Sequence, residues 1–269
     1  MAVSIDTVYQ KVLAIANQKG GVGKTTTSVN LAASLSVTRK NVLLVDLDPQ
    51  GNATTGSGVD KSNLSLSVYD LLSESENIEN VVLCPDAGYD LLPANGDLVA
   101  AEIDLMTGDD REVRLRSIID SVRDTYDYIV VDCPPSLNML TVNALVAADG
   151  VVIPMQCEYY ALEGLSALMD TISAIRDRLN PSLKIEGILR TMYDPRSKLT
   201  SEVNGQLFNY FGDIVYRTVV PRNIRLAEAP SYGKPAIKYD KQSRGAIAYL
   251  ALAGELLRRH DEAAAAVSG

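Results

Sequence analysis

The stretch KGGVGKTTT, residues 19–27, decides the fold of this chain. It follows an apolar run, VLAIAN (12–17), and opens a helical pattern. A glycine-rich loop between a strand and a helix is a typical cradle for phosphate groups, because backbone N–H groups and the positive end of the helix point at the anion. The usual pattern, G-x-x-x-x-G-K-[ST], has glycine where this chain has Gln18. A second lysine, Lys19, instead stands at the mouth of the loop.

Each residue type in this loop suits one part of a nucleotide. The glycines allow backbone conformations that other residues disfavour, and they let phosphate approach the main chain closely. We expect Lys24 to reach the β- and γ-phosphates and the hydroxyl of Thr25 to ligate Mg²⁺. The predicted nucleotide-binding residues of the loop are Lys19, Gly20, Gly21, Val22, Gly23, Lys24, Thr25 and Thr26.

Composition narrows the class of protein. The chain has 269 residues, of which 46% are hydrophobic, so it can build a sizeable core. It has no run of eighteen apolar residues, and its first residues lack the order of a signal peptide. Cys84, Cys133 and Cys157 have no metal-ligand spacing, which favours a reducing, cytoplasmic location, and we expect Cys133 to be a small buried residue. His260 follows two arginines, so we expect it on a solvated helix face.

Short apolar runs alternate with helical patterns along the chain. The predicted strands are 11–17, 41–47, 126–132, 150–155, 185–192 and 213–220, and the predicted helices include 26–35, 115–124, 162–179 and 201–211. The strand runs are continuously apolar, which is typical of strands buried on both faces. Strand alternating with helix predicts right-handed crossovers, hence an α/β fold with a mostly parallel twisted sheet flanked by helices on both faces.

No repeat or linker divides the chain. We therefore predict one domain over 11–260, with a short N-terminal extension, 1–10, and a flexible tail, 261–269.

Acidic residues end two further strands. Asp46 and Asp48 lie at the end of the second predicted strand, and Asp132 ends the third, before the rigid turn CPPS. In an open parallel sheet, ligands bind at the carboxyl ends of the strands, so these acids and the loop should converge on one crevice. An aspartate that ends an apolar strand is well placed to hold Mg²⁺ through water.

Four stretches together carry a resemblance to a known family. KGGVGKTT (19–26) is the deviant form of the Walker A motif, and VDLDPQGNAT (45–54) and VVDCPPS (130–136) are similar to switch regions of ParA-type partition ATPases. VVPRNIRLAEAPSYGKP (219–235) resembles the chromosomal members, often called Soj. The resemblance covers residues 11–259, nearly the whole chain.

The resemblance implies an ATPase that uses ATP and Mg²⁺ and forms a homodimer when ATP is bound. In this family the extra lysine, here Lys19, reaches across the dimer interface to the phosphates of the partner's nucleotide. Two facing ATP–Mg sites carry excess negative charge, which donated cations relieve. By the same match, Asp48 positions the attacking water and Asp132 supports Mg²⁺, beside Thr25. The implied catalytic residues are Lys19, Lys24, Asp48 and Asp132, and the implied adenine contacts are Met192, Pro221 and Asn223.

Charge is unevenly distributed along the sequence. The net charge is −9, but residues 190–244 hold ten basic and five acidic residues, a net of +5, which leaves −14 elsewhere. Soj-like proteins bind double-stranded DNA without sequence preference through arginines, which implies a role for Arg196, Arg222 and Arg225. The resemblance also implies hydrolysis that is weak alone, a ParB-type centromere-binding partner that stimulates it, and a nucleoid-associated location.

Three other classes of ATPase share the loop. A MinD-like membrane-cycling ATPase of cell division needs a basic amphipathic C-terminal helix, whereas this chain ends in an acidic, alanine-rich segment. An iron–sulfur carrier needs paired cysteines, and Cys133 has no C-x-x-C partner. A tyrosine autokinase would have tyrosines in its tail, and none follows Tyr249. The sequence therefore favours the partition ATPase, with the membrane-cycling ATPase as the main alternative, and no membrane partner is expected.

Overall fold

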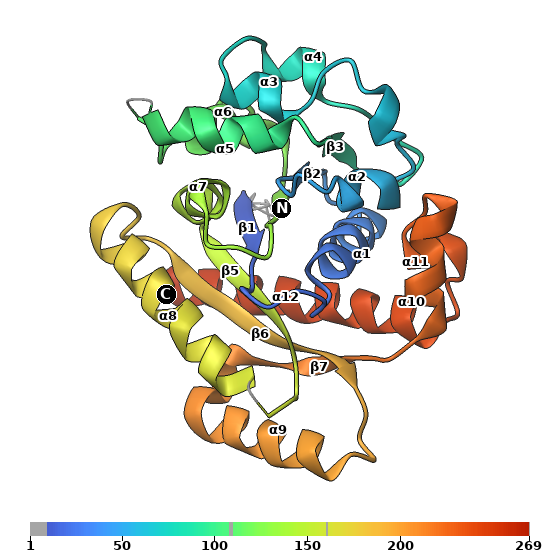
Figure 1. Cartoon of the computed structure of the whole chain (residues 1–269). Helices are drawn as coiled ribbons and strands as arrows, with labels where there is room; N and C mark the ends of the chain where they lie inside the picture. Colours follow the sequence, from blue (N-terminus) through green and yellow to red (C-terminus); the bar gives the residue numbers. More distant parts are fainter. Residues whose placement is uncertain (1–9, 108–109, 160, 269) are drawn as a thin grey trace, which may run out of the picture.

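One parallel sheet organises the molecule (Figure 1). The computed structural model describes residues 10–107, 110–159 and 161–268. Within these residues the sheet has seven strands in the order β3-β2-β4-β1-β5-β6-β7, and every pairing is parallel. The strands are β1 (Lys11–Ile15), β2 (Val42–Asp46), β3 (Asp90–Leu92), β4 (Tyr128–Asp132), β5 (Gly150–Gln156), β6 (Lys184–Tyr193) and β7 (Val215–Pro221). The predicted α/β class with a mostly parallel sheet is confirmed.

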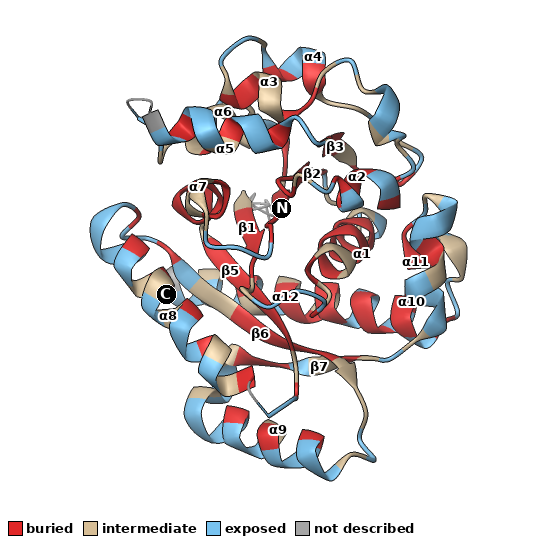
Figure 2. Cartoon of the chain, viewed as in Figure 1, coloured by how far each residue is buried: buried red, intermediate tan, exposed pale blue. Residues whose placement is uncertain are grey.

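Helices cover both faces of this sheet. They are α1 (Lys24–Val37), α2 (Asn52–Gly56), α3 (Val68–Leu72), α4 (Ile78–Val81), α5 (Leu98–Thr107), α6 (Arg114–Val122), α7 (Met139–Ala147), α8 (Ala161–Arg178), α9 (Lys198–Phe211), α10 (Ile224–Glu228), α11 (Ala236–Tyr239) and α12 (Arg244–Ser268). On β1, Val12 and Ala14 face the core that contains α5, α6, α7 and α8, whereas Leu13 and Ile15 face the core that contains α1 and α12. Successive side chains of a strand point to opposite faces, so a strand between two helix layers must be apolar throughout. Figure 2 shows the buried interior that results.

The sequence reading missed the edge strand β3. This strand has three residues and pairs with β2 on one side only, so its apolar run is too short to stand out. The six strands that the sequence predicted all lie in the sheet, within one or two residues of their expected ends.

Helix α12 reaches further than the sequence indicated. It continues through residues 261–268, a segment rich in alanine, the strongest helix former, and the flexibility predicted for this tail stays a prediction. The expectation for His260 was wrong. His260 is buried rather than solvated, because it shares a face of α12 with Leu252 and Leu256, which pack on the sheet. Its Nδ1 lies 2.8 Å from the Tyr128 hydroxyl, and its Nε2 lies 3.0 Å from Glu186 Oε1.

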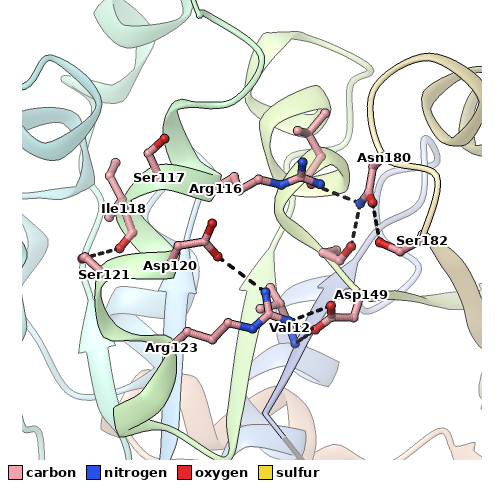
Figure 3. A network of polar contacts seen from close by, with 12 residues as sticks. Val12, Arg116, Ser117, Ile118, Asp120, Ser121, Arg123, Asp149, Asn180 and Ser182 are labelled. Carbon is pink, nitrogen blue, oxygen red and sulfur yellow. Dashed lines mark hydrogen bonds and ion pairs between the residues drawn. The ribbon is translucent and has the colours of Figure 1, made fainter.

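A polar network closes the amino end of the sheet (Figure 3). Both carboxylate oxygens of Asp149 accept hydrogen bonds of 2.6 Å from Arg123 Nη2, and Oδ2 also accepts one of 2.8 Å from the backbone N–H of Val12. Nearby, Asn180 donates to three carbonyls at the end of α7 and just after it. The network ties β1 and β5 to the helices and leaves the opposite end of the sheet for the site.

No helix in the described part of the chain has the length and apolarity to cross a membrane.

Candidate functional site

The glycine-rich loop joins β1 to α1 at the carboxyl end of the sheet. Gly21 has φ of 74° and Gly23, which caps α1, has φ of 90°, so both need the conformational freedom of glycine. A Cβ atom at Gly20 or Gly21 would meet nothing within 4 Å, so the loop is open at both positions. The loop therefore presents its backbone to free space at the positive end of α1, which suits a bound phosphate.

Two residues outside the loop hold it in place. The hydroxyl of Thr191 on β6 lies 2.7 Å from the carbonyl oxygen of Val22. The amide of Gln156, at the end of β5, donates to the carbonyl of Gly21 at 2.9 Å. The sequence reading missed both, although each lies at the carboxyl end of a predicted strand, where a search for polar side chains would have found them.

The two lysines of the loop point to different places. Lys24 is only 7% exposed, its Nζ donates to the carbonyl of Lys19 at 3.2 Å, and burial lowers its pKa, while the charge of Asp132 opposes this shift. The Lys19 side chain is 48% exposed, and its Nζ lies 2.5 Å from Glu158 Oε2. Lys24 therefore belongs to the interior of the loop, whereas Lys19 extends over the protein surface.

Asp46 and Asp132 are cross-strand neighbours at the ends of β2 and β4, and both are fully buried. The Oδ2 atom of Asp46 accepts hydrogen bonds of 2.7 Å from the N–H and from the hydroxyl of Thr54, and its Oδ1 accepts one of 3.2 Å from the N–H of Asp48. Asp46 thus fixes the turn that follows β2. Its structural role was not anticipated from the sequence.

Asp132 has one oxygen with a partner and one without. Its Oδ1 accepts a 2.7 Å hydrogen bond from Ser28, and its Oδ2 is buried with no hydrogen-bond partner. Burial raises the pKa of Asp132, the charge of Asp46 raises it further, and the hydroxyls of Ser28 and Thr25 oppose the shift. A buried carboxylate oxygen without a partner, beside the hydroxyl of Thr25, fits a hydrated Mg²⁺ ion. Among the described residues, no three His, Cys, Asp or Glu side chains form a metal cage.

Asp48 follows β2 and lies near Lys24 of the loop. Its side chain is mostly buried, its Oδ1 accepts from the N–H of Gln50 at 2.9 Å, and its charge acts on the Lys24 ammonium. The structure therefore brings Lys24, Asp48 and Asp132 together, as the sequence predicted from their strands.

A cavity of about 190 Å³ lies beside the loop. Its lining contains the three residues expected at the adenine: Met192, Pro221 and Asn223. Thr26, Val220 and Tyr249 complete much of the wall, with Arg222 at the same turn as Pro221. Met192 has φ of 48°, a conformation that few non-glycine residues adopt, so the backbone is strained where the cavity opens.

The three arginines expected to contact DNA are exposed but are not equivalent. Arg196 follows β6 and Arg222 follows β7, and these strand ends are paired through Tyr193 and Pro221. Arg196 pairs with Asp194 at 2.9 Å, whereas Arg225 on α10 pairs with Glu228 at 2.8 Å and with Asp240 at 3.4 Å.

Arg190 lies in the same basic segment of the sequence, residues 190–244, but its side chain is not on the surface of the molecule. It is buried, and it donates to Asn204 and to carbonyls of β7.

Cys133, which follows β4, is buried, as expected.

Comparison with known proteins shows which family the chain belongs to. The model of the family described as AAA domain matches residues 10–185. The sporulation initiation inhibitor protein Soj of Bacillus subtilis is 53% identical over 91% of this chain and 98% of its own length. The chromosome partitioning protein ParA of Myxococcus xanthus is 50% identical over 93% of this chain and 88% of its own length.

A solved structure has a similar fold and a different stated activity. It is described as cobyrinic acid a,c-diamide synthase from Mycobacterium smegmatis with bound ATP analog and magnesium. It is 38% identical to this chain, with a TM-score of 0.83, and the match covers 93% of this chain and 96% of that one. Likeness of fold alone therefore does not select the reaction. About half of the residues are shared with the Soj and ParA proteins over nearly the whole chain, and on this basis the chain belongs to the ParA/Soj family of ATPases in the MinD/ParA superfamily.

Proposed function

We propose that this protein is a DNA-partition ATPase whose ATP-bound homodimer binds double-stranded DNA without sequence preference. Hydrolysis, weak in the protein alone and stimulated by a ParB-type partner, releases the dimer. The protein is an ATPase of a family that includes chromosome-partitioning proteins, which supports the general activity. The dimer, the DNA surface, the partner and a location on the nucleoid are the parts that we propose.

The acids at the carboxyl end of the sheet suit a magnesium-dependent phosphoryl transfer. Bound with ATP, Mg²⁺ would neutralise charge on the β- and γ-phosphates. The Thr25 hydroxyl would ligate it, and the free Oδ2 of Asp132 would accept a hydrogen bond from one of its waters. Asp46, whose oxygens are already bonded to Thr54 and Asp48, would keep the turn after β2 in place.

The remaining groups would act on the phosphates and on the attacking water. The loop N–H groups and Lys24 would bind the phosphates, and Thr26, Met192, Pro221 and Asn223 would line the pocket for adenine and ribose. Asp48 would orient the water and accept its proton as the oxygen of the water bonds to the γ-phosphorus. The bond from the γ-phosphorus to the bridging oxygen would break, and ADP would leave with that oxygen.

The orientation of Lys19 is the observation that carries the dimer proposal. Lys24 already supplies a cation inside the loop, whereas the Lys19 ammonium lies outside it, half-exposed and paired with Glu158. An ion pair this exposed contributes little to stability, so it can open at small cost. Lys19 is therefore available to the nucleotide of a second subunit, where the charge of ATP and Mg²⁺ attracts it.

DNA binding would follow from the basic ends of β6 and β7. Arg196 and Arg222 lie on these neighbouring ends, and in a dimer the two copies would act together. Arg225 would have to exchange its two carboxylate partners for phosphates. Contacts of this kind read the DNA backbone, so binding should be independent of sequence and weaken with salt.

The deciding experiment compares the effects of ATP and ADP on the wild-type protein and on variants that each lack one lysine. Light scattering would follow dimerisation, and fluorescence anisotropy would follow binding to two unrelated DNA duplexes, each with ATP or ADP. We expect dimers and equal binding of both duplexes with ATP, and neither with ADP. Lys19→Ala should keep ADP binding and lose dimerisation and DNA binding, whereas Lys40→Ala, a surface lysine before β2, should behave as wild type.

Two results would contradict the proposal. Normal ATP-dependent dimers of Lys19→Ala would remove its role across the interface, and equal DNA binding with ADP would remove the nucleotide switch. Binding to anionic lipid vesicles with ATP, without binding to DNA, would instead support the MinD-like alternative.

A further inference from the structure

One segment carries the entire net charge of the chain. Residues 60–106 contain ten acidic residues and one basic residue, a net of −9, and the rest of the chain holds 24 of each. This segment includes α3, α4, β3 and α5, and β3 is an edge strand of the sheet. Strand β7, which leads into Arg222 and Arg225, forms the opposite edge. The molecule is therefore acidic at its β3 edge, far across the sheet from the arginines proposed to bind DNA.

Helix α5 in this acidic segment is apolar on two faces. Its inner face, Leu98, Ala101 and Leu105, is buried in the core. On the other side, Val99, Ile103 and Met106 are 52%, 63% and 60% exposed. Exposed residues are visible along α5 in Figure 2.

The spacing of the three exposed residues, i, i+4 and i+7, aligns them in one stripe along the helix. A helix on the surface of a domain normally has a polar outer face, and aligned apolar side chains on that face are a mark of an interaction site.

We propose that this outer face of α5 is a docking surface for a partner protein that presents a basic amphipathic segment. The apolar side of such a segment would cover Val99, Ile103 and Met106. Its lysines or arginines would meet the surrounding acids, which include Asp97 and Glu102. The segment has a single basic residue of its own, Lys61, and the ion pair from α6 to one of its acids, Arg114 to Glu74 at 3.3 Å, leaves most of its negative charge in place.

Charge complementarity selects this occupant over others. DNA and anionic lipid would be repelled by a segment whose formal net charge is −9, and a second copy of the same face would bring like charges together. A basic segment gains electrostatic attraction at long range and apolar contact at short range. Because the surface lies at the opposite edge from β7, a partner could dock there while DNA is bound.

The test uses a designed probe and a matched pair of variants. The probe is a labelled synthetic peptide of 18 leucine and lysine residues, ordered to form an apolar stripe along a helix. A second peptide has the same composition in an order that gives no stripe. The double variant Ile103→Ser and Met106→Ser alters the α5 face. The control, Ile247→Ser and Leu250→Ser, changes two residues of α12 with the same spacing and with 54% and 40% exposure.

We expect the striped peptide to bind the wild-type chain and to bind the α5 variant about tenfold more weakly, since anchors in the centre of an interface contribute most of the affinity. The control variant should bind it within twofold of wild type, and the unstriped peptide should bind wild type about tenfold more weakly. All affinities should fall as salt is raised. Thermal unfolding would establish that both variants are folded.

Equal affinity of the striped peptide for wild type and for the α5 variant would overturn the proposal. Concentration-dependent self-association that the α5 variant abolishes, together with no peptide binding, would also overturn it and assign the face to a second copy. ATP-dependent DNA binding by the α5 variant is a separate readout, expected to be unchanged, so failure of this inference is distinguishable from failure of the proposed function.

Discussion

Asp149 and Asp132 lie beside the same central strand, β1, but at its opposite ends and in opposite surroundings. Asp149, at the amino end, accepts hydrogen bonds from Arg123 on both oxygens and from the N–H of Val12 (Figure 3). Asp132, at the carboxyl end, accepts one from Ser28 and has a buried oxygen with no partner. Within the described residues, Asp132 forms no ion pair, and neither do its neighbours Asp46 and Asp48.

The difference separates groups that stabilise the fold from groups that serve a ligand. A carboxylate whose hydrogen bonds are complete contributes to stability, and its removal leaves buried partners without a charge to face. A buried carboxylate without a partner costs free energy in the empty protein and gains its partner only when a ligand binds. Changes at the two ends should therefore separate binding and catalysis from stability.

Lys24→Ala should have the largest effect at the carboxyl end. The buried ammonium is the cation inside the loop, so its loss should weaken ATP and ADP binding by at least about 100-fold, because charge-assisted hydrogen bonds to phosphate are strong. Titration calorimetry would measure this, with Lys40→Ala as the control. Nucleotide affinity within a few-fold of wild type would show that the backbone alone holds the phosphates.

Asp48→Ala should affect turnover rather than binding. Loss of the group proposed to orient the water should lower ATP hydrolysis by about 100-fold, while ATP affinity changes less than about threefold. Phosphate release with Mg²⁺ and DNA present would measure the rate, and Asp86→Ala, an exposed acid of a surface loop, is the control. An unchanged rate would mean that another residue positions the water.

At the amino end of the sheet, a substitution should lower stability and leave nucleotide binding unchanged. Asp149→Ala should lower the free energy of unfolding by about 2 kcal/mol, because Arg123 and the N–H of Val12 lose their acceptor in a partly buried setting. Urea unfolding would measure stability, and ATP affinity of the folded variant should equal that of wild type. Asp149→Asn, which keeps an acceptor for Val12, should be less damaging. A variant that loses ATP affinity but not stability would break the distinction between the two ends.

Asp132→Asn should have the smallest effect on stability, and in the stabilising direction. Burial raises the pKa of Asp132 in the folded protein, so the folded state holds its proton more tightly than the unfolded state does. The ionised form then costs stability, and this cost accumulates as pH rises from the ordinary pKa range of an aspartate up to the raised pKa, above which it stays constant. Without nucleotide, the variant should be more stable than wild type by about 1 kcal/mol at pH 8, with a smaller difference at pH 5.5.

Urea unfolding of the empty protein at the two pH values tests this sign. The same variant should bind ATP less tightly in the presence of Mg²⁺, because it loses the carboxylate proposed to face the hydrated ion. Parallel stability curves for wild type and variant would mean that Asp132 is equally ionised in both states of the chain.

By itself, the sequence determined the strand order in the chain, the fold class and the position of the loop. These follow from local patterns: continuous apolar runs for the six longer strands, and glycines before Lys24 and Thr25. It also placed Asp48 and Asp132 at the same edge, because parallel strands bring their carboxyl ends together.

Only the tertiary structure decided which polar groups are buried and which of them have hydrogen-bond partners. His260 is buried because α12 packs against β7 and α1, which brings its ring to Tyr128 of β4. Asp46 bonds to Thr54 across a turn, and Thr191 holds the loop from a strand far along the chain. The three-residue strand β3 exists because β2 offers it an edge, and the outer stripe of α5 is exposed because no element of the described chain covers it. Each depends on contacts between distant segments, whereas periodicity and turn chemistry report only on neighbours along the chain.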